Sequence, residues 1–179
     1  IGILVLGGSQ AAKVFAEKLP EIFLRCSKNN VPIKIYQHCL PTQNEKLKSF
    51  YRNANIDFEI FNFSNNLIEY FSKVNLAITR SGSSMLAELT NANIPFISVP
   101  LPSSADNHQL KNAIFYERKK LAFLVEEKNI DEQLSELIIK IFNNNSLVDE
   151  IISNQEQYSD KNVYNKISEV LKEIVNEKY

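Results

Sequence analysis

Three of the four glycines in this 179-residue chain lie in two short turns, and each turn joins an apolar run to a helical pattern. Gly7 and Gly8 follow the apolar run at residues 3–6, and Gly82 follows the run at residues 74–78. A strand, a tight turn and a helix form the repeating unit of a parallel sheet. We therefore expect both turns at the carboxyl edge of one sheet, where open α/β sheets bind ligands.

The same alternation of short apolar runs and helical periodicity continues along the chain, which is typical of a doubly wound α/β sheet. We predict strands at residues 3–6, 32–37, 58–61, 74–78, 95–99 and 122–125, the last of them at an edge. Predicted helices cover residues 11–27, 42–53, 67–73, 83–91 and 106–119, with Asp106 as the cap of the last, and the remainder is helical with apolar spacing at Leu134, Leu137, Ile138 and Ile141. The pattern thus predicts one α/β domain over residues 1–179, a Rossmann-like parallel six-stranded sheet with helices on both faces.

Composition narrows the class of partner. The chain is 44% hydrophobic and 23% charged, as in globular proteins, and its net charge is −1 with Lys and Arg scattered among Asp and Glu. That distribution gives no basic face for a nucleic acid. Cys26 and Cys39 form neither a disulfide framework nor a zinc motif, so we expect a reducing, cytoplasmic setting. No apolar run reaches the roughly 20 residues of a membrane span, and no signal peptide is recognisable.

The chain begins without Met, directly in the apolar residues of its first predicted strand. We therefore expect an excised domain or one half of a larger enzyme.

The turn after the run at residues 74–78 carries the residue types of an anion site. Helix N–H groups and the positive end of the helix dipole converge on such a turn. Ser83 and Ser84 are predicted N-cap residues whose hydroxyls can also donate to phosphate, and Glu88 lies one turn further, where a carboxylate accepts two bonds from a ribose diol. Arg80 could pair with phosphate or with a carboxylate. Capping alone explains one such turn, whereas two on one edge favour a diphosphate or nucleotide-sugar ligand.

The turn at residues 7–12 lacks the G-x-G-x-x-G spacing of dinucleotide-binding proteins, and no Asp or Glu ends the second predicted strand. NAD and FAD are therefore not expected. The turn remains a candidate diphosphate cradle at Gly8, Ser9 and Gln10, or a plain strand-to-helix connection.

Two further loops belong to the same predicted edge. His108 and Gln109 follow the fifth strand, where an imidazole and an amide can read sugar hydroxyls. No metal-ligand spacing surrounds His108, so we expect no metal. Phe63 and Ser64 follow the third strand, and Phe63 either belongs to the core, which is the favoured interpretation, or flanks a flat base.

Taken in order, these pieces resemble the carboxyl-terminal half of the MurG glycosyltransferases over about residues 1–125. The matching pieces are Gly7-Gly8-Ser9-Gln10, Phe63-Ser64, Arg80-Ser81-Gly82, Glu88, residues 95–100, and Asp106-Asn107-His108-Gln109 followed by Asn112-Ala113.

The resemblance implies a GT-B fold of two Rossmann-like domains, of which the carboxyl-terminal one holds UDP-N-acetylglucosamine (UDP-GlcNAc). It implies a metal-independent, inverting transfer of GlcNAc to undecaprenyl-diphosphate-muramyl-pentapeptide at the cytoplasmic membrane face, with the donor as substrate and no cofactor. The family's amino-terminal acceptor domain is absent from this chain, so the lipid-linked acceptor would be reached through that missing domain or a partner chain. No residue is assigned as the general base.

Carried over by motif, the roles fall on residues already singled out. Gly8, Ser9 and Gln10 would contact the diphosphate, Ser83 and Ser84 the α-phosphate and ribose, and Glu88 the ribose hydroxyls. The backbone at Ser64, beside Phe63, would read uracil, and His108 with Gln109 would contact the GlcNAc hydroxyls. Arg80 is counted among the donor-binding residues without a separate role.

Two other functions stay open. One is a stand-alone nucleotide-sugar-binding subunit with a separate membrane partner, similar to the cytosolic subunit of the eukaryotic split GlcNAc transferase acting on dolichol diphosphate. The other is a UDP-sugar hydrolase or epimerase, which needs a catalytic acid and base. His108 is the candidate the sequence offers for that chemistry.

Overall fold

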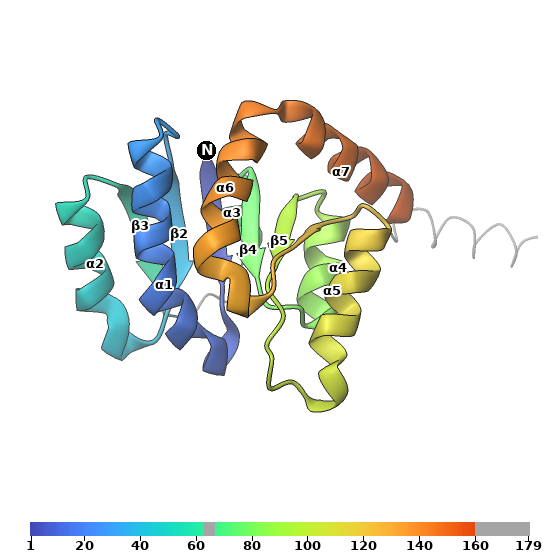
Figure 1. Ribbon diagram of the computed structural model, residues 1–179, viewed down its shortest axis with the longest axis horizontal. Coiled ribbons are helices and arrows are strands. Elements are labelled where there is room, and N and C mark those ends of the chain that lie inside the picture. Colours follow the sequence, from blue (N-terminus) through green and yellow to red (C-terminus); the bar gives the residue numbers. More distant parts are fainter. Residues whose placement is uncertain (63–66, 160–179) are drawn as a thin grey trace, which may run out of the picture.

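A computed structural model describes residues 1–62 and 67–159, and the side chains of residues 9–12 also lie outside the description (Figure 1). Its centre is a six-stranded sheet in the order β3-β2-β1-β4-β5-β6, and every neighbouring pair is parallel. The strands are β1 (Gly2–Leu6), β2 (Lys34–His38), β3 (Asp57–Phe61), β4 (Leu76–Thr79), β5 (Phe96–Ser98) and β6 (Phe123–Leu124). The order reverses between β1 and β4, which is the switch point of a Rossmann sheet.

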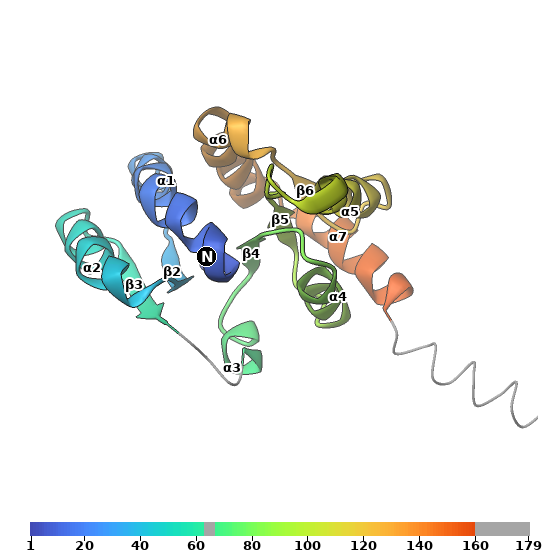
Figure 2. The same cartoon turned by 90° about the horizontal axis from the view of Figure 1, so that it is seen from below.

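Helices cover both faces of the sheet, as Figure 2 shows. The α-helices are α1 (Gly8–Lys28), α2 (Asn44–Asn53), α3 (Ile68–Phe71), α4 (Ser83–Asn91), α5 (His108–Arg118), α6 (Ile130–Asn143) and α7 (Asn145–Tyr158). Short 3-10 turns precede three of them at η1 (Pro41–Gln43), η2 (Ala105–Asn107) and η3 (Glu127–Asn129). Helices α1, α2 and α6 lie on one face, and α3 and α4 lie on the other, with α7 against α4.

Strand β1 shows why this sheet is buried from both sides. All five of its residues are buried, and successive side chains point to opposite faces. Ile3 and Val5 belong to the core under α1, α2 and α6, whereas Leu4 and Leu6 belong to the core under α4. A parallel strand covered on both faces carries a continuous apolar run rather than an alternating one, and residues 3–6 have that character.

The predicted Rossmann-like sheet of six parallel strands is confirmed, including β6 at an edge. Helix α4 spans the predicted residues 83–91, and most other ends differ by one to three residues. The prediction that Asp106 caps a helix is wrong. Asp106 (φ 48°) and Asn107 (φ 54°) both adopt left-handed conformations, and α5 begins at His108. Short polar side chains tolerate this region better than others do, so the chain reverses here before the helix starts.

Candidate functional site

The exits of β1, β4 and β5 lie side by side at one edge of the sheet, on the lower side in Figure 1. Leu6 is in register with Thr79, and Thr79 is in register with Ser98, so the three strands end at the same level. This edge includes the switch point between β1 and β4. Crevices outside the carboxyl ends of strands at such a point are where open α/β sheets bind ligands.

The turn after β1 depends on glycine. Gly8 has φ +64°, a conformation that costs an L side chain energy, although a Cβ there would meet nothing within 4 Å. Gly7 is the N-cap residue of α1 and makes no side-chain cap. The first N–H groups of α1 therefore have no partner within the helix and lie at the edge. Ser9 and Gln10 open this helix, and their side chains are not described.

The turn after β4 is built differently, and it corrects one prediction. Gly82, not Ser83 or Ser84, is the N-cap residue of α4; its backbone is extended and its carbonyl accepts a hydrogen bond from Leu86 N at 3.1 Å. An N-cap residue needs that extended conformation, which falls one residue earlier than expected. Ser83 and Ser84 are instead the first helical residues, and both are exposed. Their side chains are thus open to solvent, and the first N–H groups of α4 have no partner within the helix and receive no side-chain cap from Gly82.

Glu88 lies on the exposed surface of α4, four residues after Ser84. Residues four apart lie above one another on the same helix face. The carboxylate therefore stands one turn behind the open end of the helix, on the same side as the Ser84 hydroxyl.

Arg80 is buried, with 6% of its surface exposed, and its side chain faces inward. One terminal nitrogen donates to the carbonyls of Val99 and Pro100, each at 3.2 Å, and the other forms an ion pair with Glu127. The guanidinium carbon lies 4.7 Å from the centre of the Phe15 ring. Of the two partners left open by the sequence, phosphate or carboxylate, the structure shows the carboxylate.

Gln109 reaches back from the first turn of α5 to the turn between β4 and α4 (residues 80–82), which we call the serine turn. Its Oε1 accepts hydrogen bonds from Ser81 N at 3.1 Å and from Leu101 N at 3.0 Å. Asn112, one turn further along α5, donates from Nδ2 to Ser81 O at 3.0 Å. The hydroxyls of Ser81 and Ser98 are 2.7 Å apart. Ser81, Ser98 and Asn112 were not predicted to have a role in the site. The signal that could have identified the two serines is a small hydroxyl residue at each of two successive strand exits.

His108 is exposed at the start of α5. Its Nδ1 lies 2.7 Å from Ala105 O, and because a carbonyl only accepts, Nδ1 carries the proton. In the neutral ring, Nε2 is then an acceptor. The other histidine, His38, is half-buried, with Nε2 2.8 Å from Asn62 O. That contact is structural.

Phe63 and Ser64 lie outside the described residues. Asn62, just before them, donates from Nδ2 to Cys39 O at 2.9 Å and exchanges side-chain hydrogen bonds with Asn44. The exits of β2 and β3 are thus tied together by amides. Burial raises the pKa of the Cys39 thiol at this place, which keeps it protonated.

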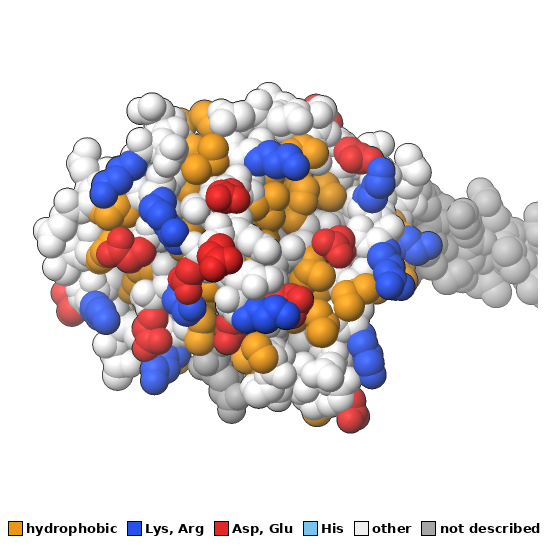
Figure 3. All heavy atoms as spheres, viewed as in Figure 1, with side chains coloured by type: hydrophobic (Ala, Val, Ile, Leu, Met, Phe, Trp, Pro, Cys, Tyr) orange, Lys and Arg blue, Asp and Glu red, His pale blue; other side chains and the backbone are white. Residues whose placement is uncertain are grey.

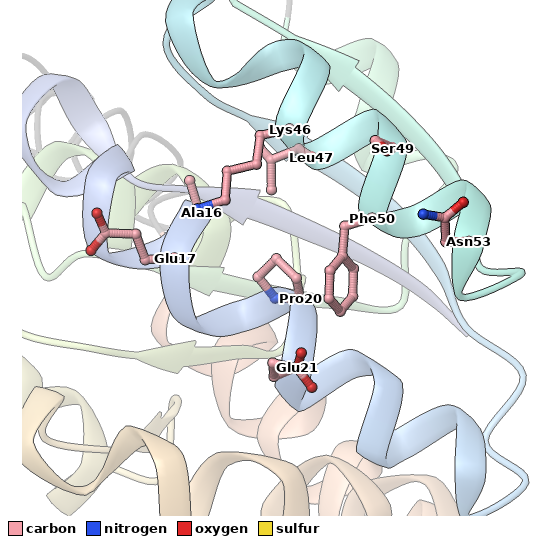
Figure 4. A pocket seen from close by; sticks show the side chains of 9 residues that line it. All are labelled: Ala16, Glu17, Pro20, Glu21, Lys46, Leu47, Ser49, Phe50 and Asn53. Carbon is pink, nitrogen blue, oxygen red and sulfur yellow. The ribbon is translucent and has the colours of Figure 1, made fainter.

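The hollows of the surface do not all coincide with this edge. A hollow of about 460 Å³ lies between α1 and α2, where Pro20 and Phe50 face each other, and none of the predicted site residues lines it (Figure 4). A smaller hollow of about 250 Å³ lies at the edge itself, beside the start of α5, and its lining includes Leu101, Asn107 and Glu127. Pockets are a guide to sites only where chemistry converges, so we place the candidate site at the edge.

Charges on the visible face are mixed: Figure 3 shows Lys and Arg interspersed with Asp and Glu rather than gathered by sign. Among the described residues, no three His, Cys, Asp or Glu side chains cluster as metal ligands would. Within that same part of the chain, no helix combines the length and apolar character needed to cross a membrane.

The fold and the edge define a Rossmann-type α/β domain with two open helix ends that suit a phosphorylated ligand. The chain belongs to the family described as the glycosyltransferase family 28 C-terminal domain, whose pattern matches residues 2–176.

Two relatives and one solved structure illustrate the similarity. The UDP-N-acetylglucosamine--N-acetylmuramyl-(pentapeptide) pyrophosphoryl-undecaprenol N-acetylglucosamine transferase of Pelagibacter ubique is 35% identical over 178 residues, which is 99% of this chain and 50% of that protein. The transferase of the same name from Rickettsia bellii is 35% identical over 85% of this chain and 44% of its own length. The crystal structure of Acinetobacter baumannii MurG matches with a TM-score of 0.80 and 26% identity, over 97% of this chain and 52% of that one. The chain thus spans about half the length of the curated relatives it matches.

Proposed function

We propose that this chain is the donor-binding domain of a UDP-GlcNAc glycosyltransferase that adds GlcNAc to undecaprenyl-diphosphate-muramyl-pentapeptide, the lipid-linked precursor of peptidoglycan. The observation that carries the proposal is the alignment of the β1, β4 and β5 exits at one edge, with two open helix N-termini. Family membership supports the choice of ligand, because relatives of this chain are named for that donor and acceptor.

In this proposal each of the two turns binds a different part of the nucleotide. The backbone around Gly8, with Ser9 and Gln10, binds the diphosphate, and the α4 end with Ser83 and Ser84 binds the α-phosphate and ribose. Glu88 accepts hydrogen bonds from the ribose diol. The segment of Phe63 and Ser64 contacts uracil.

The sugar lies toward α5. In its neutral form His108 offers Nε2 as an acceptor, and Gln109 offers the N–H groups of its amide as donors. The pair can therefore both accept hydrogen bonds from GlcNAc hydroxyls and donate to them. Arg80 does not touch the ligand in this proposal, because its guanidinium already binds Val99, Pro100 and Glu127. It supports the turn from behind.

Helix N-termini and hydroxyls supply the positive electrostatic potential that a diphosphate needs. We accordingly propose a metal-independent, inverting transfer, with UDP-GlcNAc as donor substrate and no cofactor. In this proposal the binding site for the acceptor and the general base lie in another domain of the enzyme or in a partner chain. The complete enzyme would act in the cytoplasm, at the inner face of the cell membrane.

The test is thermal stabilisation by UDP-GlcNAc compared with UDP-GalNAc and NAD. A ligand at 100 times its dissociation constant stabilises by about 2.7 kcal/mol, which is readily measured. Stabilisation by UDP-GlcNAc that is lost in Glu88→Ala and kept in Glu117→Ala, an exposed glutamate of α5, supports the proposal. Equal responses of both variants, or a response to NAD alone, contradict it.

The stand-alone subunit makes the same donor contacts and differs in where the acceptor half resides. Co-purification of a second polypeptide with the natural protein would favour that alternative. Hydrolysis of UDP-GlcNAc by the chain alone would instead favour the hydrolase.

A further inference from the structure

Three side chains, those of Ser98, Gln109 and Asn112, hold Ser81 of the serine turn from positions remote in the sequence. Ser81, Ser98, Gln109 and Asn112 connect the exits of β4 and β5 with the first turns of α5, and we call this set the turn clamp. Ser81 and Ser98 are fully buried, and the two α5 residues are half-buried. A buried polar network of this kind fixes one arrangement when its members are satisfied.

The chemistry of the partners determines how the Gln109 amide is oriented. Two backbone N–H groups, those of Ser81 and Leu101, converge on one terminal atom of the side chain at 3.1 and 3.0 Å. Only the oxygen can accept both, so that atom is Oε1. The remaining Nε2 then carries two N–H donors and no lone pair. A free glutamine amide offers both a donor and an acceptor to a sugar hydroxyl, but here the acceptor oxygen of Gln109 is already occupied.

We propose that Gln109 is a positioning residue that couples the two ends of the ligand site. Its Oε1 fixes the N–H groups of Ser81 and Leu101, while its Nε2 stays available as a donor-only group on the ligand side. Asn112 supports the same turn through Ser81 O. This inference rests on the proposed function for the identity of the ligand, and on the hydrogen bonds alone for the clamp.

The coupling has a specific consequence. Ser81 is two residues before Ser83, where α4 opens its N–H groups to the phosphate. A change at Gln109 should therefore weaken binding at the phosphate end even for a ligand that lacks the sugar. A residue that only touched the sugar would leave the affinity for UDP unchanged.

Two variants of Gln109 separate its roles in the full chain. Gln109→Met removes both the acceptor and the donor, whereas Gln109→Glu keeps an oxygen for the two N–H groups and removes the amide donors. Lys111→Gln, an exposed neighbour on α5, is the matched control. The measurements are amide hydrogen exchange at Ser81 and Leu101 by NMR, and the dissociation constants of UDP and UDP-GlcNAc.

In Gln109→Met we expect exchange at both amides to accelerate about tenfold or more, and the affinity for UDP to fall about tenfold, since an unpaired buried N–H is costly. In Gln109→Glu the two amides stay protected, while the ratio of UDP-GlcNAc to UDP affinity falls. That ratio cancels any repulsion between the new carboxylate and the diphosphate. Amides of β1 report global opening and serve as the internal reference.

Unchanged exchange at Ser81 and Leu101 in Gln109→Met would overturn the clamp, whatever the ligand results. Protection lost in Gln109→Glu would contradict the assignment of Oε1 as the holding atom. If Gln109→Met does not fold, Asn112→Asp removes the donor to Ser81 O at constant size and should lower UDP affinity by a smaller factor. A wild-type chain that binds neither nucleotide refutes the proposed function, and the exchange data still decide the clamp.

Discussion

The two turns of the candidate site reach the same edge by different means. The turn after β1 is local: Gly8 adopts φ +64°, and the glycine itself permits the conformation. The turn after β4 has an ordinary extended glycine at Gly82 and is held by side chains from β5 and α5, the furthest being Asn112, 31 residues away. The conformation of the first turn is determined by its own residues, whereas that of the second depends on contacts with distant parts of the fold.

We expect the largest loss of stability when the buried ion pair beside the turn after β4 is broken. Arg80→Leu leaves Glu127 without its partner and the carbonyls of Val99 and Pro100 without their donor. Removing one member of a buried ion pair costs 3–5 kcal/mol, and we expect about 3 kcal/mol because Glu127 keeps 22% side-chain exposure. Urea unfolding measures the loss. Glu127→Gln, which removes the charge but keeps an acceptor, should cost less; equal costs would show that the hydrogen bonds of Arg80 to Val99 and Pro100 add nothing beyond the ion pair.

Glycine replacement should affect the turns unequally. Gly8→Ala forces a left-handed alanine and should destabilise by about 1 kcal/mol or more. Gly82→Ala fits the observed backbone, and the stiffer unfolded chain offsets the poorer cap, so the net change should stay within about 0.5 kcal/mol. Thermal unfolding of the two variants in parallel tests this. Similar losses would remove the distinction between a local turn and a supported one.

A serine at the cap of α4 sharpens the contrast between stability and function. Gly82→Ser supplies a hydroxyl where no side-chain cap exists and should stabilise the fold by a few tenths to about 1 kcal/mol. The new hydroxyl would occupy N–H groups that the proposal reserves for phosphate, so UDP affinity should fall. Differential scanning calorimetry measures the stability of the variant, and isothermal titration calorimetry measures its affinity for UDP. Higher stability with undiminished affinity would place the phosphate elsewhere.

Removal of divalent metal ions is expected to have no effect on donor binding. Because both turns offer backbone N–H groups in place of a cation, treatment with EDTA should leave the affinity for UDP-GlcNAc unchanged. Titration with and without added magnesium checks this. A marked loss on chelation would mean that the phosphates need a metal as well as the helix ends.

The contrast also explains what could be predicted from sequence. Apolar runs gave the strands, and the bounds of α4 follow from the residues around it, because both signals are local. The ion pair of Arg80 with Glu127 joins residues 47 apart, and the hydrogen bond of Gln109 to Ser81 joins residues 28 apart. No local pattern encodes those partners. The left-handed Asp106 and Asn107 were missed for a different reason, since an Asp before a helix also matches a cap.

In the proposed function, UDP-GlcNAc binds at the edge formed by the β1, β4 and β5 exits. The most direct measurement is an NMR titration of the full chain with UDP-GlcNAc, following the backbone amides. We expect shifts concentrated at Gly8, at Ser83 and Ser84, and at the start of α5. Shifts confined to Glu21 and Asn53, which line the hollow between α1 and α2, would contradict it.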